Sequence, residues 1–179
     1  MRVILKPRKA RPFFARHPWV FSGGIERVEG SPVAGDLVTV VSREGVFLGK
    51  GFFHPESQIA VRLCRFREDD EAGEAWIREA VEKAARLRID VLRLPEAAGM
   101  YRLVHAEADG LPGLTVDRYG DFLVVQCQSA GMERRREAWT KVLAETFAPK
   151  GIYARGDTWG RKMEKLPPRR GVDDPSSAD

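Results

Sequence analysis

Short apolar runs separated by turn residues fill the first third of the chain. After Val3-Ile4-Leu5 they recur at residues 37–41, 46–53 and 59–66, with breaks at residues 43–45 and 54–57. Runs of this length between turn residues are typical of β-strands. Residues 1–68 are therefore predicted to form a small, closed or nearly closed β-barrel, with a short helix between residues 8 and 15. Gly49 and Gly51 inside a strand pattern predict a bulge or a close backbone approach.

The apolar period changes after an acidic break at residues 68–74. Apolar side chains then recur at intervals of three and four residues, at Trp76, Ile77, Ala80, Val81, Ala84, Leu87 and Val91. This spacing predicts an amphipathic helix. Residues 69–96 are accordingly interpreted as a helix that links two domains.

Residues 97–166 combine both kinds of pattern. Two apolar runs, at residues 114–116 and 122–125, flank Tyr119-Gly120-Asp121, which predicts a β-hairpin. Helical spacing returns from residue 133 to 147, and residues 151–154 add a strand. This β-β-α-β order predicts a small α+β domain with the helix on one sheet face, so the fold class is α+β. Residues 167–179 are polar and proline-rich, and are predicted to be disordered.

Composition narrows the class of protein. Of 179 residues, 43% are hydrophobic and 31% charged, and apolar runs long enough for a membrane span or a secretory signal are missing. The prediction is a cytoplasmic protein with no membrane partner. Cys64 and Cys127 lie in strand-like runs and are expected to be buried and reduced. The sequence predicts no metal site.

Basic residues gather at the start of the chain. Although the formal net charge is only +4, the first 16 residues contain no acid and six cations, here called the basic arm: Arg2, Lys6, Arg8, Lys9, Arg11 and Arg16. A second basic cluster comprises Arg161, Lys162, Lys165, Arg169 and Arg170. Uneven basic charge is typical of a protein that binds a phosphate backbone, and a solubilising surface is the alternative.

Candidate catalytic residues are few. His105, Glu107 and Asp109 alternate as on one face of a strand, which fits a metal or acid–base group. Carboxylates that accept backbone N–H bonds beside the following Gly-Pro-Gly turn are the preferred interpretation. Glycine-rich nucleotide loops and nucleophile motifs are missing from the chain. We therefore predict neither catalytic nor cofactor-binding residues.

His17 is followed by two aromatic residues and two glycines. Beside the basic arm, a histidine on a glycine-flanked loop suits contacts with phosphates or base edges. Trp19 and Phe21 fit either stacking on bases or a place in the core. Their alternation before Gly23 favours the core.

Two longer stretches resemble a known family. Residues 16–25, Gly35-Asp36, Gly49-Lys50-Gly51 and the strand at 59–66 resemble the PUA domain of RlmI-type large-subunit ribosomal RNA cytosine methyltransferases. Residues 101–114, followed by Val116-Asp117-Arg118-Tyr119-Gly120, look like the central domain of the same enzymes. The resemblance covers residues 1–166.

The resemblance implies an RNA-binding role for the PUA-like part. Its implied RNA-binding residues are Lys6, Arg8, Lys9, Arg11, Arg16, His17, Gly23 and Gly24. In this family a further C-terminal domain binds S-adenosylmethionine and carries the nucleophilic cysteine that attacks carbon-6 of the target cytosine. The sequence has no match to that domain, so we expect RNA binding, ribosomal RNA in particular, without independent catalysis. A freestanding RNA-binding module and a protein-interaction adaptor are the alternatives, and a homodimer remains open.

Overall fold

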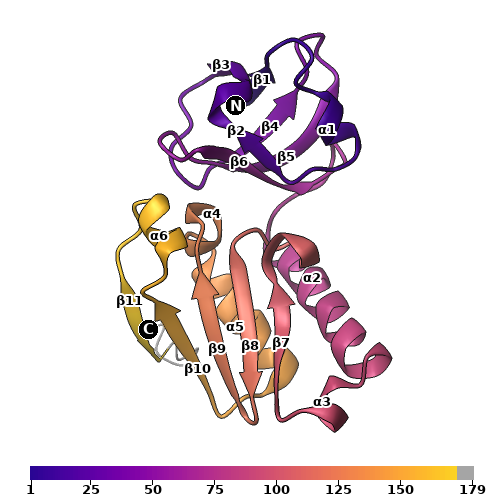
Figure 1. Cartoon of the computed structure of the whole chain (residues 1–179), viewed down its shortest axis with the longest axis vertical. Helices are drawn as coiled ribbons and strands as arrows, with labels where there is room; N and C mark the ends of the chain where they lie inside the picture. The colour runs from indigo at the N-terminus through magenta and orange to yellow at the C-terminus, as the bar shows by residue number, and fades with distance from the viewer. Residues whose placement is uncertain (173–179) are drawn as a thin grey trace. The chain divides into compact units, whose positions relative to one another are not determined.

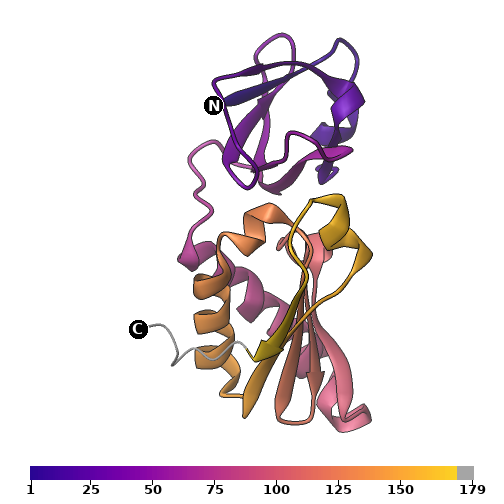
Figure 2. The ribbon, with the colours of Figure 1, turned by 90° about the vertical axis from the view of Figure 1, so that its left-hand side faces the viewer.

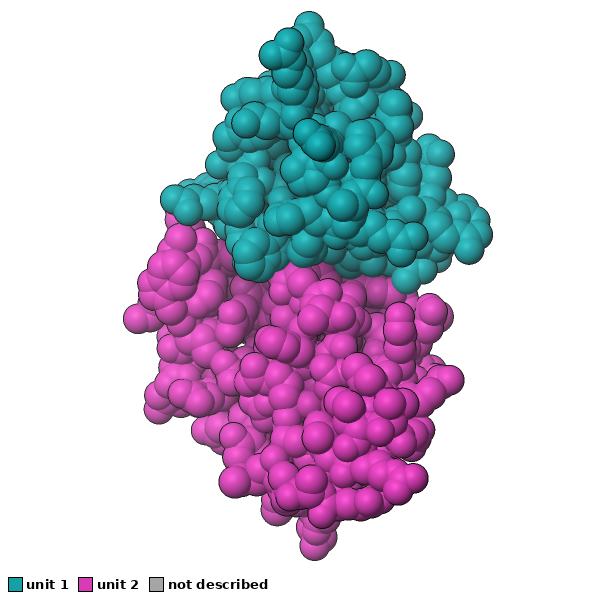
Figure 3. All heavy atoms as spheres, turned by 45° about the vertical axis from the view of Figure 1, so that its right-hand side comes forward, with its two compact units in different colours: residues 1–72 teal, residues 73–179 magenta. Residues whose placement is uncertain are grey.

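The computed structural model describes residues 1–172 and divides into two compact units. Unit 1 comprises Met1–Ala72, and unit 2 begins at Gly73 (Figure 3). Each unit has its own sheet, and each is described by itself below.

A six-stranded sheet forms most of unit 1. Its strands are β1 (Arg2–Leu5), β2 (Trp19–Phe21), β3 (Ile25–Glu29), β4 (Leu37–Val41), β5 (Phe47–Phe53) and β6 (Ile59–Arg65). The sheet order is β2-β6-β5-β4-β1-β3, and the sheet curls into a half-barrel with β2 and β3 at its edges (Figure 1). All neighbouring strands are antiparallel except β1 and β4. The helices of this unit are α1 (Arg11–Phe14) and the 3-10 turn η1 (Ser22–Gly24).

The core of unit 1 lies inside the curl of this sheet. It contains inward-facing aliphatic residues of five strands together with Phe13 from α1. Gly51 shows why glycine is needed in β5: a Cβ added there would lie 2.2 Å from the carbonyl oxygen of Arg62 on β6. The strand register shifts between Lys50 and Gly51. The predicted bulge and close backbone approach are thus confirmed.

Unit 2 is built on a five-stranded sheet in the order β11-β10-β9-β8-β7. Its strands are β7 (Met100–His105), β8 (Leu114–Tyr119), β9 (Phe122–Cys127), β10 (Gly151–Gly156) and β11 (Arg169–Val172). The predicted hairpin is confirmed, because Tyr119 pairs with Phe122 across the turn between β8 and β9. β9 and β10 are parallel and are joined by the helices α4 (Ala130–Glu133) and α5 (Arg136–Phe147).

The amphipathic helix forms as α2 (Glu74–Arg86) and continues as the short π-helix η2 (Leu87–Val91). Its buried face includes Trp76, Ile77 and Val81, and α2 packs against α5 and β7. The sequence predicts a separate linking helix over residues 69–96. The structure instead makes α2 part of unit 2, because its apolar stripe covers one face of that sheet (Figure 2).

The end of the described chain differs from the prediction of disorder. Residues 169–172 form strand β11, which pairs antiparallel with β10 from Tyr153↔Val172 to Gly156↔Arg169. The helix α6 (Trp159–Met163) leads into it, and α3 (Leu94–Ala97) and the 3-10 helix η3 (Ala106–Asp109) complete the unit. A polar strand at a sheet edge needs no apolar period, which is why composition missed it. Residues 173–179 of the predicted tail lie outside the described residues.

Within residues 1–172, no helix has both the length and the apolar character needed to cross a membrane.

Candidate nucleic-acid interface

The eight residues predicted to bind RNA all belong to unit 1. Between β1 and α1 lie Lys6, Arg8 and Lys9; α1 begins at Arg11; Arg16 and His17 follow it; and Gly23 and Gly24 form η1. The structure joins these segments, because Lys6 donates from its backbone N–H to the Gly24 carbonyl and from Nζ to the Gly23 carbonyl, both at 2.9 Å. The basic arm therefore runs beside the glycine turn.

Helix α1 is short, and both of its ends turn sharply. Pro12 occupies the first turn, where its missing N–H needs no partner, and Phe13 anchors the helix in the core. Arg8 and Arg16 flank the helix with φ of 63° and 57°. Left-handed backbone at a non-glycine residue costs about 1–2 kcal/mol, and such residues cluster at binding sites. The arginines thus occupy two constrained turns.

A pocket of about 450 Å³ opens between α1, β2 and η1. Four of the eight predicted residues line it, namely Lys9, His17, Gly23 and Gly24; the others lining it are Leu5, Pro12, Phe13, Trp19, Val20 and Phe21. The predicted residues outside the lining are Lys6, which holds the Gly23 carbonyl, and the exposed Arg8, Arg11 and Arg16. Arg16 lies over the Phe66 ring, 5.6 Å from its centroid, as a cation–π contact.

Four rings at this pocket follow one another edge to face. The centroid distances are 6.1 Å for Phe13–His17, 6.3 Å for His17–Trp19 and 6.4 Å for Trp19–Phe21, with interplanar angles of 83°, 83° and 87°. Aromatic pairs favour this geometry, which stiffens the row of rings.

The structure corrects the placement of Trp19 and Phe21 in the core. Trp19 is 36% exposed and Phe21 50%, whereas Val20 between them is buried. Successive side chains of β2 point to opposite faces of the sheet, so Val20 meets the core while Trp19 and Phe21 lie on the other face and line the pocket. The sequence correctly placed Trp19 and Phe21 on one face of the strand, but that face is the exposed one and not the one that packs in the core.

His17 is held by the backbone two residues further along. The N–H of Trp19 donates to Nδ1 of His17 at 3.2 Å. Nδ1 also lies 3.2 Å from the Trp19 carbonyl, so the Trp19 backbone can hold the ring in either tautomer, and Nε2 takes no part in these two contacts.

The strand interpretation of His105, Glu107 and Asp109 is wrong, because β7 ends at His105 and the two acids lie in η3. The expected carboxylate–backbone bond is confirmed for Asp109, whose Oδ2 accepts the N–H of His105 at 2.6 Å. Among the described residues, no three His, Cys, Asp or Glu side chains gather to hold a metal ion.

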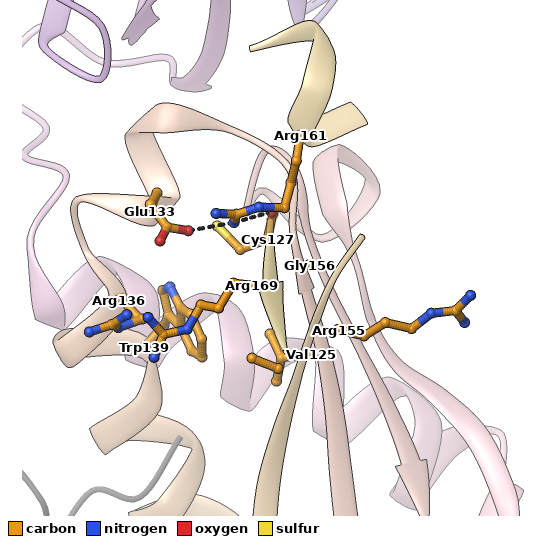
Figure 4. Close-up of a pocket in the computed structure, with 10 residues that line it drawn as sticks. Val125, Cys127, Glu133, Arg136, Trp139, Arg155, Gly156, Arg161 and Arg169 are labelled. Carbon is orange, nitrogen blue, oxygen red and sulfur yellow. Dashed lines mark hydrogen bonds and ion pairs between the residues drawn. The ribbon is translucent and has the colours of Figure 1, made fainter. Parts of the chain in front are cut away.

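A small pocket in unit 2 surrounds Arg161, which belongs to the second basic cluster but is 2% exposed. Its guanidinium donates to the Glu133 carboxylate at 2.6 Å and the Cys127 carbonyl at 2.9 Å (Figure 4). It also donates to the Pro167 carbonyl at 2.7 and 3.0 Å. The space is about 10 Å³, about enough for one water. Arg161 is therefore a structural anchor, and the predicted surface cluster loses one of its members.

Both cysteines are buried and neither forms a disulfide, as predicted. Burial raises the pKa of the Cys127 thiol well above its ordinary value. Such a thiol carries little thiolate at neutral pH, so Cys127 lacks the reactivity of a nucleophile.

Most of the chain is similar to known proteins. Residues 3–66 match a family model described as PUA-like domain. Ribosomal RNA large subunit methyltransferase I of Shewanella denitrificans is 43% identical over 173 residues, which are 96% of this chain and 43% of that protein. The protein of the same name from Yersinia pseudotuberculosis is 36% identical, over 96% of this chain and 43% of its own length.

Two solved structures share the fold. A proposed SAM-dependent methyltransferase from Streptococcus mutans has a TM-score of 0.73 at 13% identity, covering 87% of this chain and 40% of the other. A proposed methyltransferase complexed with SAH gives the same values. The chain spans about two fifths of the length of the curated relatives that it matches. It contains a PUA-like domain and, over 96% of its length, is homologous to part of these ribosomal RNA methyltransferases.

Proposed function

We propose that this chain is the RNA-binding part of a large-subunit ribosomal RNA methyltransferase, and that RNA contacts the pocket between α1, β2 and η1. The observation that carries the proposal is the pocket itself, in which exposed aromatic rings lie beside cations and a glycine turn. Rings offer faces for stacking, and cations offer contacts to phosphates. Homology to ribosomal RNA methyltransferases supports ribosomal RNA as the ligand.

The proposed contacts divide by chemistry. Lys9 and His17 line the pocket, so they are assigned to a nucleotide that enters it. Arg8, Arg11 and Arg16 are exposed outside the lining, so they are assigned to the phosphate backbone around it. Gly23 and Gly24 have open space where a Cβ would stand, which lets RNA approach the backbone of η1.

Methyl transfer is proposed to depend on residues outside the two described pockets. Neither described pocket fits S-adenosylmethionine: the larger is lined by no carboxylate that could bind ribose hydroxyls, and the smaller holds about one water. The chain would then supply recognition of the RNA, and the transfer from S-adenosylmethionine to carbon-5 of a cytosine would take place elsewhere in the enzyme.

The test is RNA binding by the chain with Trp19→Ala and Phe21→Ala, measured by fluorescence anisotropy with a labelled large-subunit rRNA fragment. Both rings lie outside the buried core cluster of unit 1, so the variants should fold, which circular dichroism verifies. Loss of stacking should weaken binding about tenfold for each ring. Phe14→Ala, an exposed ring of α1 outside the pocket lining, is the matched control. Equal affinity of all variants would refute the assigned site and favour the adaptor function.

A second measurement addresses the cofactor. Titration calorimetry of the chain with S-adenosylmethionine should give no binding heat. Saturable heat at micromolar ligand would contradict the proposal that this chain binds RNA but not the methyl donor.

A further inference from the structure

One face of the unit 2 sheet is open. α2 and α5 cover the other face, where Leu123, Val125 and Ile152 are buried (Figures 1 and 2). Within the described residues of unit 2, no helix lies along the strands of the open face (Figures 1 and 2). By strand alternation this face carries Phe122 and Val124 of β9 and Tyr153 and Arg155 of β10.

Strand register arranges these side chains in rows. Phe122 lies opposite Gly151, Val124 lies opposite Tyr153, and Tyr153 lies opposite Val172. Arg155 lies opposite Arg170 in the next row. On β9, β10 and β11 these rows define the open-face surface, which comprises Phe122, Val124, Tyr153, Arg155, Arg170 and Val172. The same face continues on β8 with Tyr119 opposite Phe122 and with Asp117, which is paired with Arg102, opposite Val124.

The two aromatic rings of this surface are diagonal neighbours on adjacent strands. Phe122 is 53% exposed and Tyr153 is 43% exposed. Phe122 leans over β10, because a Cβ added at Gly151 would lie 3.4 Å from its Cδ1. One side of the ring is thus supported by backbone while much of it faces solvent. Diagonal neighbours on a sheet are separated by about 7–8 Å, which allows each ring to accept its own base.

The charge of this surface is positive where the two arginines meet. The side chains of Arg155 and Arg170 are both more than half exposed, and their guanidiniums share one carboxylate, that of Asp157. Figure 4 shows Arg155 pointing away from the pocket around Arg161, on the side of β10 opposite Trp139. Two cations against one anion leave a net positive charge beside the aromatic rows.

We propose that the open-face surface binds single-stranded RNA, with bases stacked on Phe122 and Tyr153 and phosphates bound by Arg155 and Arg170. Aromatic residues on an open sheet face, flanked by arginines, accept unpaired bases irrespective of sequence. Arg155 and Arg170 lie side by side with one carboxylate between them, and this local excess of positive charge favours a polyanion as the ligand. The inference rests on the proposed function only for the class of ligand, and it adds a second RNA contact in unit 2.

The experiment uses the full chain and a fluorescein-labelled, unstructured oligouridine of about 12 nucleotides, a length within the range bound by single-strand modules. Phe122→Ala with Tyr153→Ala should weaken binding at least about tenfold while leaving the salt dependence nearly unchanged. Arg155→Ala with Arg170→Ala should weaken binding and reduce the slope of log K against log salt by roughly one to two. Arg86→Ala and Val91→Ala, exposed residues of α2 and η2, are the matched controls.

Repeating the series in the Trp19→Ala, Phe21→Ala background separates this inference from the proposed function. If only the unit 1 variants weaken binding, the open-face inference is wrong; if only the unit 2 variants do, it stands and the pocket assignment fails. Photo-crosslinking of 4-thiouridine RNA should give modified peptides that contain residues 122–124 and 153–155. Circular dichroism verifies that each variant is folded. Unchanged affinity of the folded unit 2 variants, or self-association of the chain that Phe122→Ala abolishes, would overturn the proposal.

Discussion

Arg88 binds Asp109 through two parallel hydrogen bonds. Nη1 lies 3.0 Å from Oδ1 and Nη2 lies 2.8 Å from Oδ2, and about nine tenths of each side chain is buried. The same guanidinium donates from Nε to the carbonyl of Arg102, while Asp109 accepts the His105 N–H. One ion pair therefore fastens η2 to the end of β7 and to η3, and it assigns Asp109 a structural role.

Breaking this ion pair should destabilise unit 2. Asp109→Asn or Arg88→Ala leaves a largely buried charge without its partner, at a cost of about 3 kcal/mol. Hydrogen exchange of β7 and β8 amides should report this loss as faster exchange from unit 2, with unit 1 unaffected. Arg102→Ala is the control, because its ion pair with Asp117 is more exposed and should contribute about 0–1 kcal/mol. If loss of the Arg102–Asp117 pair destabilised unit 2 as much as loss of the Arg88–Asp109 pair, burial would not explain the strength of the Arg88–Asp109 pair.

Replacing Arg161 should loosen α6 and the chain that follows it. Arg161→Met keeps much of the side-chain volume but leaves the Glu133 carboxylate and the Cys127 and Pro167 carbonyls without their donor. The expected cost is about 3–5 kcal/mol. Amide exchange in residues 159–172 should accelerate more than exchange in β8. Lys162→Met, an exposed neighbour on the same helix, should leave both rates unchanged.

The pairing of β11 should depend on pH in the acid range. The hydrogen bond and charge of Arg170 hold the pKa of the Asp157 carboxyl below its ordinary value. A depressed folded-state pKa means that the stabilising contribution is present above the unfolded pKa, about 3.9, and is lost as pH falls through the folded pKa. NMR shifts of the β11 amides should therefore change below about pH 4. Asp157→Asn should remove this transition, and a transition that persists would assign it to another group.

The elements that could be predicted from the sequence are those that bury apolar side chains at regular intervals. Strands β1, β4, β5 and β6, helix α2 and the β8–β9 hairpin each bury a set of apolar side chains, so their patterns could be recognised in the sequence. β11 could not be predicted in this way, because its sequence Arg-Arg-Gly-Val is held by backbone pairing with β10 at a sheet edge. Backbone hydrogen bonds leave no trace in the pattern of side chains.

In the candidate site, too, some features could be predicted from the sequence and others depend on the fold. The basic arm and the two glycines were visible as charge and as backbone permissiveness, and four of the eight predicted residues line the pocket. The contribution of Trp19 and Phe21 depends on which face of β2 meets the core, and the folded sheet determines that face. Likewise, charge counting included Arg161 in a surface cluster, because only the fold reveals the three carbonyl and carboxylate partners around it.

The exposed arginines of the basic arm should control the salt dependence of RNA binding. Arg8→Ala, Arg11→Ala and Arg16→Ala together should weaken binding equally for RNAs of different sequence, since phosphate contacts carry no base information. They should also reduce the slope of log K against log salt by roughly two to three, about one for each lost phosphate contact.

The control for this prediction replaces three exposed arginines of unit 1 that lie outside the basic arm. Arg27, Arg43 and Arg67 each lie within 4 Å of a carboxylate, on Glu29, Glu26 and Asp69 respectively. Their charge is already compensated, so a phosphate gains less from them, and their triple alanine variant should keep the wild-type slope. If both triple variants reduce the slope equally, binding follows net charge alone and the basic arm has no special role. A reduction confined to Arg8, Arg11 and Arg16 locates the phosphate contacts beside the aromatic pocket.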